Sequence, residues 1–167
     1  LTNILKNNHS INKSRHLWWK LRPHTAFSTI EFRMCDVQRR FKNIEMLASL
    51  AQALCYVALN EHRDGRLVES FNIELLNDSL WKAIRYGSES YIYDEVSDER
   101  YTMEEFVRVM LDYSTPGLKF FKSTKIIDQV ENVLKDGTEG DKQYFYFKQN
   151  NNNFDVLKQY LINNIDL

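Results

Sequence analysis

Residues 16–36 read HLWWKLRPHTAFSTIEFRMCD, and this stretch decides the fold. Aromatic and β-branched side chains dominate both of its halves, and Pro23 separates them. The pattern predicts two short extended segments, separated around Pro23-His24-Thr25-Ala26, that pair as a hairpin. Because successive side chains of a strand alternate between its two faces, Glu31 and Arg33 share one face, and the apolar residues between and beside them share the other.

Polar side chains gather on one face of each predicted strand. Alternation groups Trp18 with Lys20 and Arg22 in the first strand, and Thr29 with Glu31, Arg33 and Cys35 in the second. Glu31 and Arg33 stand about 7 Å apart along the backbone, so both side chains can reach one bound group. A carboxylate suits a hard cation such as Mg²⁺, and a guanidinium suits phosphate oxygens. The more ordinary role of such residues is to form ion pairs on a solvated sheet face.

After Asp36 the periodicity changes from strand to helix. A long, mostly buried helix is expected up to a polar break at residues 61–65, with its apolar positions at Ile44, Leu47, Ala48, Ala51, Leu54, Cys55 and Ala58. Thr102 has the form of a helix cap, and Pro116-Gly117 is expected to end the helix that follows it. Further helices are expected around residues 80–86, 126–134 and 154–165, and a short strand or extended loop at 91–93. The predicted class is α+β: an antiparallel strand pair followed by a helical C-terminal region.

Composition and length limit the class of protein. The chain has 167 residues, of which 43% are hydrophobic and 27% charged, as in one folded domain rather than a disordered or fibrous chain. No run approaches the roughly 18 consecutive apolar residues of a membrane span, and the first residues are too polar for a signal peptide. A cytoplasmic location is therefore expected. The two cysteines, Cys35 and Cys55, match neither a zinc site nor a redox pair and are expected to be buried thiols.

Positive charge is concentrated at the N-terminal end of the chain. Residues 1–42 hold nine Lys or Arg and two acidic residues, a local balance of +7 in a chain of net charge −1. This quarter is expected to face an anionic partner: nucleic acid, nucleotide phosphates or an acidic small molecule. One alternative is therefore a non-catalytic module that binds nucleic acid through its basic residues, or a protein through an unpaired sheet edge. That alternative gives Glu31 no role.

Three blocks of sequence carry a resemblance to a known family. They are WWxLRPxxxFxTIEFRxCD at residues 18–36, WKAIRYG at 81–87 and GTxGDxQ at 137–143. Together they resemble the type 2 glutamate–cysteine ligase family of carboxylate–amine ligases, over about residues 16–165. Ser28 stands where that family usually has Gly, and Lys142 where it usually has Arg.

The resemblance implies a glutamine synthetase-like catalytic fold, in which a curved antiparallel sheet carries ATP and divalent metal ions. By position, Glu31 would be a Mg²⁺ ligand, Arg33 would stabilise the acyl phosphate, and Arg22 would contact a phosphate or a carboxylate. Arg85 would reach the nucleotide or the amino-acid substrate, although a surface ion pair is its ordinary role. Asp36 is as readily a helix-entry residue as a catalytic one.

The implied reaction is amide formation driven by ATP. A carboxylate such as that of glutamate attacks the γ-phosphate to give an acyl phosphate, and an amine such as that of cysteine then displaces phosphate. The chain begins at Leu1, and the family's opening half, with its acidic metal-binding strand residues, is absent from it. Residues 1–167 are therefore expected to be a single domain fragment, the C-terminal part of a ligase domain that cannot catalyse alone. Its expected partners are the small-molecule substrates and the missing N-terminal half; a homo-oligomer is compatible with the sequence, a membrane partner is not expected, and nucleic acid is disfavoured.

Other reactive side chains in the first block are given ordinary roles. Cys35 has no His and Asp arrangement around it in the sequence pattern, so a half-buried structural thiol is expected rather than a nucleophile. His24, beside the turn proline, is expected to be solvated rather than bound to phosphate. Alternation sends Trp18 and Trp19 to opposite faces, so one can stack on a base or substrate while at least one lies in the core.

Overall fold

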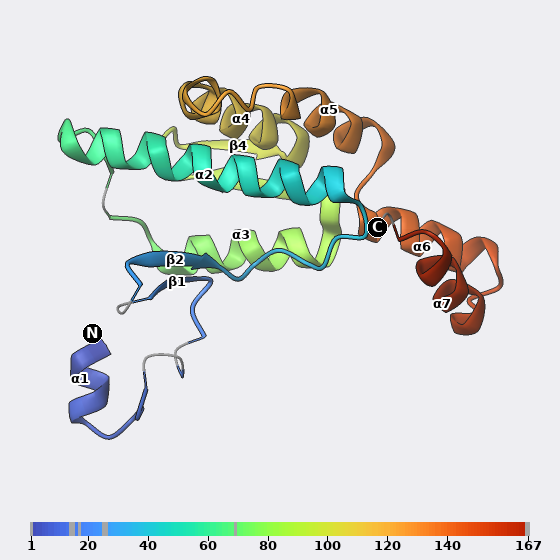
Figure 1. Ribbon diagram of the computed structural model, residues 1–167, viewed down its shortest axis with the longest axis horizontal. Helices are drawn as coiled ribbons and strands as arrows, with labels where there is room; N and C mark the ends of the chain where they lie inside the picture. The colour runs from blue at the N-terminus through green and yellow to red at the C-terminus, as the bar shows by residue number, and fades with distance from the viewer. Residues whose placement is uncertain (1, 14–15, 17, 25–26, 69, 166–167) are drawn as a thin grey trace. The chain divides into compact units, whose positions relative to one another are not determined.

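The computed structural model describes residues 2–13, 16, 18–24, 27–68 and 70–165 (Figure 1). The chain divides into two compact units, Leu1–Val37 and Gln38–Leu167. That both belong to a single domain fragment stays a prediction of the sequence.

The first unit contains a two-stranded antiparallel hairpin. β1 (Leu21–His24) pairs with β2 (Thr29–Phe32), and the register sets Arg22 opposite Glu31. The hairpin expected from the sequence is confirmed, but Pro23 and His24, which were expected in the segment between the strands, belong to β1 and pair with Ile30 and Thr29. A short helix, α1 (Thr2–Asn7), precedes it and was not expected, because six residues carry too little periodicity to reveal a helix.

The second unit is mostly helical, with one further antiparallel strand pair, β3 with β4. Its elements in order are α2 (Phe41–Arg63), α3 (Ile73–Tyr86), the 3₁₀ turn η2 (Gly87–Glu89), β3 (Tyr91–Asp94), β4 (Glu99–Thr102), α4 (Met103–Phe120), α5 (Ile126–Asp136), α6 (Glu139–Gln149) and α7 (Phe154–Asn163). Helices with two small strand pairs make a mixed fold, so the predicted α+β class is confirmed. Within the described ranges, no helix is long and apolar enough to cross a membrane.

The hydrophobic core lies where α2, α4 and α5 pack together, as the cyan, olive and orange helices of Figure 1 show. Its buried members are Met46, Ala53, Leu111, Leu118, Ile126 and Val130. The backbones of α2 and α4 come closest at Gly117, where an added Cβ atom would stand 2.5 Å from the carbonyl oxygen of Ala53. Only a residue without a side chain fits at this crossing.

The expected helix end at Pro116-Gly117 is wrong. α4 continues through both residues to Phe120. Proline removes one backbone donor and normally breaks a helix. Here the residues just beyond it are buried in the core, Gly117 against Ala53 and Leu118 without any exposed surface, so packing outweighs the local preference.

The expected buried face of α2 is also corrected. The buried residues of this helix are Asn43, Met46, Ala53 and Val57, whereas Ile44 keeps 48% of its surface exposed. Apolar residues occur around most of the circumference of α2. Periodicity alone therefore could not identify the face that packs on α4.

Besides α1 and the turn η2, the sequence pattern did not predict α6 and β4. α6 begins at a capping box in which the Thr138 hydroxyl accepts from the Asp141 amide and the Asp141 carboxylate accepts from the Thr138 amide. This box uses Asp where Glu or Gln is the common third residue, and the polar run around it shows no helical apolar stripe. The cap expected at Thr102 is confirmed, with Glu105 as its partner.

Candidate functional site

The polar face of the β1–β2 hairpin brings three of the predicted site residues together. The Arg22 guanidinium ion-pairs with Glu31 across the strands, with Nη2 2.5 Å and Nε 2.8 Å from Oε2. Nε of Arg33 lies 4.0 Å from the other oxygen, Oε1. The side chain of Glu31 is 47% exposed, against 19% for Arg22 and 25% for Arg33. One carboxylate is therefore flanked by two guanidinium groups on a solvent-facing surface.

An indole ring extends the same face. The guanidinium carbon of Arg33 lies 5.4 Å from the centroid of the Trp18 ring, which is 80% exposed. Trp19 is half-buried. The two rings thus differ in exposure, as expected if alternation sends them to opposite faces.

This cluster has the chemistry to meet an anion and one metal ion. The guanidinium groups of Arg22 and Arg33 are of a kind that binds phosphate or carboxylate oxygens. Across the described part of the chain, no three His, Cys, Asp or Glu side chains gather into a metal site. Mg²⁺ is commonly held by one or two carboxylates together with substrate phosphates and water, so the single carboxylate of Glu31 fits as one ligand of such an ion. In the structure this carboxylate is paired with Arg22.

Three further residues, His24, Cys35 and Asp36, lie in or just after this hairpin. The His24 ring stacks on Phe27 with centroids 4.6 Å apart. Cys35 is exposed, so its expected burial is wrong; it follows the end of β2, where no partner strand covers it in the described residues, and both it and Cys55 are free thiols. Asp36 does not cap the next helix, because the residue at the start of α2 is Arg40.

Arg85, the fourth predicted site residue, lies on the last turn of α3 in the second unit. Its guanidinium carbon is 5.7 Å from the centroid of the Tyr86 ring. The side chain is exposed, and Gly87 ends the helix directly after it with a positive φ of 56°. Arg85 is thus carried by a helix end whose turn requires a glycine.

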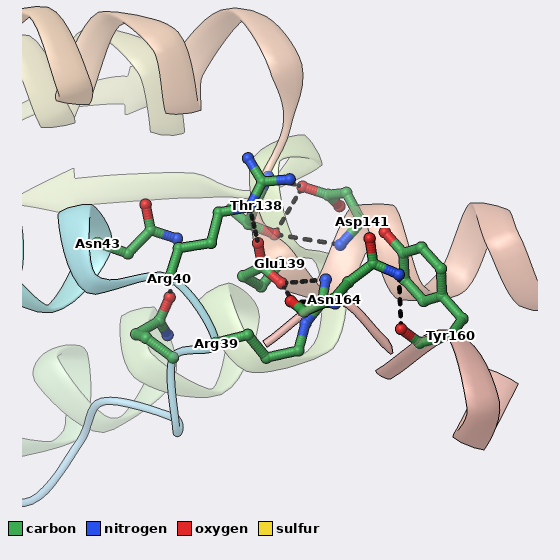
Figure 2. A network of polar contacts seen from close by, with 9 residues as sticks. Arg39, Arg40, Asn43, Thr138, Glu139, Asp141, Tyr160 and Asn164 are labelled. Carbon is green, nitrogen blue, oxygen red and sulfur yellow. Dashed lines mark hydrogen bonds and ion pairs between the residues drawn. The ribbon is translucent and has the colours of Figure 1, made fainter. Parts of the chain in front are cut away.

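A second polar cluster was not expected from the sequence, and Figure 2 shows it. Arg39 donates from Nε and Nη2 to Oε2 of Glu139, at 2.9 and 2.6 Å. Both side chains are only 8% exposed. Nε of Arg40 lies 3.9 Å from Oε1 of Glu139, the one buried side-chain oxygen or nitrogen without a hydrogen bond in the described residues. We call Arg39, Arg40, Thr138, Glu139 and Asp141 the junction cluster.

The junction cluster joins segments that are distant in sequence. Arg39 and Arg40 follow the first family block, and Glu139 lies inside the third. The second block reaches the same place, because a Cβ atom added to Gly87 would stand 3.8 Å from Oδ1 of Asp141. Residues from all three blocks, or directly beside them, therefore meet at the N-terminus of α6.

Arg39 also contacts α7. Its Nη1 donates to the carbonyl oxygen of Asn164 at 3.3 Å, and its guanidinium carbon is 4.9 Å from the centroid of the Tyr160 ring. Burial lowers the pKa of Arg39, but hydrogen bonds with Tyr160 and Glu139 and the charge of Glu139 outweigh it, so the pKa is raised. The guanidinium therefore stays charged in its buried position.

Asn43 ties the start of α2 to α5 beside the junction cluster. This buried amide donates from Nδ2 to Oε1 of Gln38, 3.2 Å away, and its Oδ1 accepts from Nε2 of Gln129 at 2.8 Å. Buried amides need such partners. Residues 39–43, which include the two residues just before α2 and its first turn, thus have polar contacts to α5, α6 and the end of α7.

A hollow of about 340 Å³ lies between α2 and α4. The Tyr113 hydroxyl donates a short hydrogen bond to the Glu61 carboxylate at its wall. Burial, together with this hydrogen bond and the charge of Glu61, raises the pKa of Tyr113 to about 12. No residue of the three family blocks lines this hollow.

Comparisons with known proteins assign the chain to a family. The sequence profile of Glutamate-cysteine ligase family 2 matches residues 4–154. A protein of Sorangium cellulosum is 29% identical over 80% of this chain and 36% of its own length, and one of Herpetosiphon aurantiacus is 28% identical over 84% and 37%. One of Gloeobacter violaceus is 31% identical over 58% and 26%. All three carry the name glutamate–cysteine ligase 2 as a provisional assignment.

The chain spans little more than a third of the length of the first two relatives, so it corresponds to a part of them. Their names favour a ligase over the alternative of a non-catalytic nucleic-acid or partner-binding module. The match to the family profile covers nearly all of the chain. It includes all three blocks and stops at the start of the last helix, α7. The chain belongs to Glutamate-cysteine ligase family 2.

Proposed function

We propose that this chain is the C-terminal part of an ATP-dependent carboxylate–amine ligase that joins the γ-carboxylate of glutamate, or of a similar acid, to an amine such as that of cysteine. Family membership supports the ligase chemistry. The observation that carries the proposal to particular residues is the face of the β1–β2 hairpin, where Arg22 and Arg33 each lie within ion-pair distance of Glu31.

The proposed reaction has two steps. A carboxylate oxygen of the acid attacks the γ-phosphorus of ATP, the bond to the bridging oxygen breaks, and ADP leaves. The amine nitrogen then attacks the carbonyl carbon of the acyl phosphate, inorganic phosphate leaves, and the nitrogen loses a proton. No side chain acts as a nucleophile in either step. Positioning and charge stabilisation carry the catalysis.

The hairpin residues have distinct roles in this proposal. Arg33 stabilises the negative charge that develops on the phosphoryl oxygens, and Arg22 contacts a phosphate or the substrate carboxylate. Glu31 holds Mg²⁺, which when bound would neutralise phosphate charge. Arg22 would share or give up its contact with Glu31 when that carboxylate takes a ligand. Arg85 contacts the nucleotide or the amino-acid substrate.

We propose further that residues 1–167 do not catalyse the reaction alone. One carboxylate, that of Glu31, is the only metal ligand that the described part of the predicted site supplies. Phosphoryl transfer from ATP requires its charge to be neutralised by firmly held metal ions. The other acidic ligands would come from the preceding portion of the ligase domain.

The test compares the isolated chain with the longest natural product that contains it, identified from the DNA upstream of the Leu1 codon. Both are assayed with ATP, Mg²⁺, glutamate and cysteine for phosphate release, and for the γ-glutamyl amide by mass spectrometry. We expect amide and phosphate in equal amounts from the longer product and neither from the isolated chain. Absence of both products from the longer chain would refute the ligase assignment. Amide formation by residues 1–167 alone would refute their dependence on the preceding portion.

A further inference from the structure

The starting observation is the buried ion pair in the second unit. Arg39 and Glu139 stand a hundred residues apart in sequence, and each side chain is 8% exposed. The pair joins the segment just before α2 to the first residue of α6. A buried charge pair of this kind is costly to break, because either partner left alone is an uncompensated charge away from water.

Arg39 reaches the helix pair formed by α6 and α7. α6 and α7 pack against each other more than against any other element, and in Figure 1 they lie together near the start of α2. Arg39 contacts both helices, through Glu139 on α6 and through the ring of Tyr160 on α7. Its guanidinium therefore ties this helix pair to the segment just before α2.

The tie extends to the turn that follows Arg85. Oδ2 of Asp141 accepts from the Thr138 amide at 2.8 Å and from its hydroxyl at 2.7 Å, so the Asp141 side chain is fixed. The same carboxylate lies against Gly87, where an added Cβ atom would stand 3.8 Å from Oδ1. Displacement of the first turn of α6 would remove this support from the helix end that carries Arg85.

We propose that Arg39 is a positioning residue of the ligase. By holding Glu139, it keeps the first turn of α6 against the Gly87 turn and so fixes the place of Arg85. This inference rests on the proposed function, in which Arg85 contacts the nucleotide or the amino-acid substrate. Arg39 itself touches neither substrate nor the reacting atoms.

The geometry requires arginine in particular. Two N–H groups of Arg39 converge on one oxygen of Glu139, and a third donates to the Asn164 carbonyl. A lysine carries the same charge but cannot present this planar set of donors. Arg39→Lys is therefore expected to restore only part of the effect, whereas a purely electrostatic role would be restored in full.

The experiment uses the full-length enzyme and a double-mutant cycle. Arg85→Met is expected to raise KM for ATP or for glutamate about tenfold, and Arg39→Met to raise the same KM severalfold with kcat changed less than about threefold. Because Arg39 acts through Arg85, the double variant is expected to have the KM of Arg85→Met. The matched control is Arg108→Met, which breaks an exposed pair of contacts to Glu104 and Glu131 and is expected to leave both constants unchanged.

Hydrogen exchange gives a readout that does not depend on activity. In Arg39→Met, residues 84–90 and 137–163 are expected to exchange about tenfold faster, while residues 103–120 exchange as in the parent. Uniformly faster exchange, no change in exchange, or KM effects that multiply in the double variant would each overturn the proposal. If the full-length protein makes no amide, the proposed function fails and the role of Arg39 towards a substrate fails with it. The exchange pattern then still decides whether Arg39 holds α6, so the two failures are distinguishable.

Discussion

Gly117 lies where α4 touches the backbone of α2. In an ordinary helix interior, Gly→Ala raises the free energy of unfolding by up to about 1 kcal/mol. At Gly117 the new Cβ would meet Ala53 at 2.5 Å, so Gly117→Ala is expected to lower the free energy of unfolding by about 1–3 kcal/mol. The matched control is Gly140→Ala on α6, whose Cβ would meet only Thr138 Oγ1 at 3.6 Å. Urea unfolding measures both, and equal effects would contradict the close crossing.

Tyr113 links protein stability to alkaline pH. Its pKa is raised from 10.0 to about 12 in the folded chain, so the folded state favours the neutral phenol. The stabilisation is complete below pH 10 and is lost as the pH rises through about 12. Tyr113→Phe removes the titrating hydroxyl, so its melting temperature is expected to fall less with rising pH over this window than that of the parent. A parent and a variant that lose stability in parallel above pH 10 would contradict this assignment.

Glu31 is the residue on which the metal proposal depends. In the full-length enzyme, Glu31→Gln keeps the size of the side chain but removes its charge, and the Mg²⁺ concentration at half-maximal activity is expected to rise about tenfold or more. Glu104→Gln is the matched control, since Glu104 is also an exposed carboxylate paired with an arginine. A shift of equal size in both variants would show that the effect is general electrostatics rather than metal binding.

Among the elements, α4 begins at a complete capping box. The Thr102 hydroxyl accepts from the Glu105 amide, and the Glu105 carboxylate accepts from the amide and hydroxyl of Thr102. Thr102→Ala is expected to lower the free energy of unfolding by about 1 kcal/mol. Thr115→Ala, inside the same helix, is the control and is expected to change it little, because alanine is the better helix former.

The same cap has a predicted acid dependence. Hydrogen bonds from the backbone and side chain of Thr102 hold the pKa of Glu105 below its usual 4.5. Its stabilisation is therefore present above that value and is lost as the pH falls through the lowered pKa. Melting temperatures between pH 3 and 6 are expected to converge for the parent and Thr102→Ala as the pH falls. A constant gap would show that Glu105 takes no part in the cap.

The sequence predicted those elements whose formation depends on residues close together in the chain. Alternation and aromatic content predicted the β1–β2 hairpin, and the cap at Thr102 predicted the start of α4. The end of α4 could not be predicted, because the contact of Gly117 with Ala53 joins residues that are far apart in sequence. α6 carries no helical apolar stripe, so its cap at Thr138 was the only local sign of it.

In the candidate site too, local spacing could be predicted from the sequence, whereas contacts between distant residues could not. The spacing of Glu31 and Arg33 placed both on one strand face, whereas the pairing of Glu31 with Arg22 depends on the length of the turn between the strands. The ion pair of Arg39 with Glu139 joins distant segments, and no local pattern announces it. The buried carboxylate of Glu139 at the start of α6 indicates an ion pair only once the fold is known, because its burial cannot be read from the sequence.

For the whole molecule, the two units are expected to differ in independent stability. The core of α2, α4 and α5 lies entirely within residues 38–167, whereas an isolated two-stranded hairpin is marginal in water. Residues 38–167 produced alone are expected to be helical and to melt cooperatively, and residues 1–37 alone to show little β structure. Circular dichroism of the two pieces tests this. A non-cooperative melt of residues 38–167 would show that the larger unit needs the smaller one.

The hairpin also bears on how this chain behaves at high concentration. Among the described residues, β1 and β2 form a sheet of two strands, and Ile30 on β2 is 56% exposed. Their outer N–H and C=O groups are templates onto which an extended segment of a neighbouring molecule can add. Production of residues 1–167 alone is therefore expected to favour insoluble, strand-stacked deposits, and Ile30→Lys is expected to delay their onset.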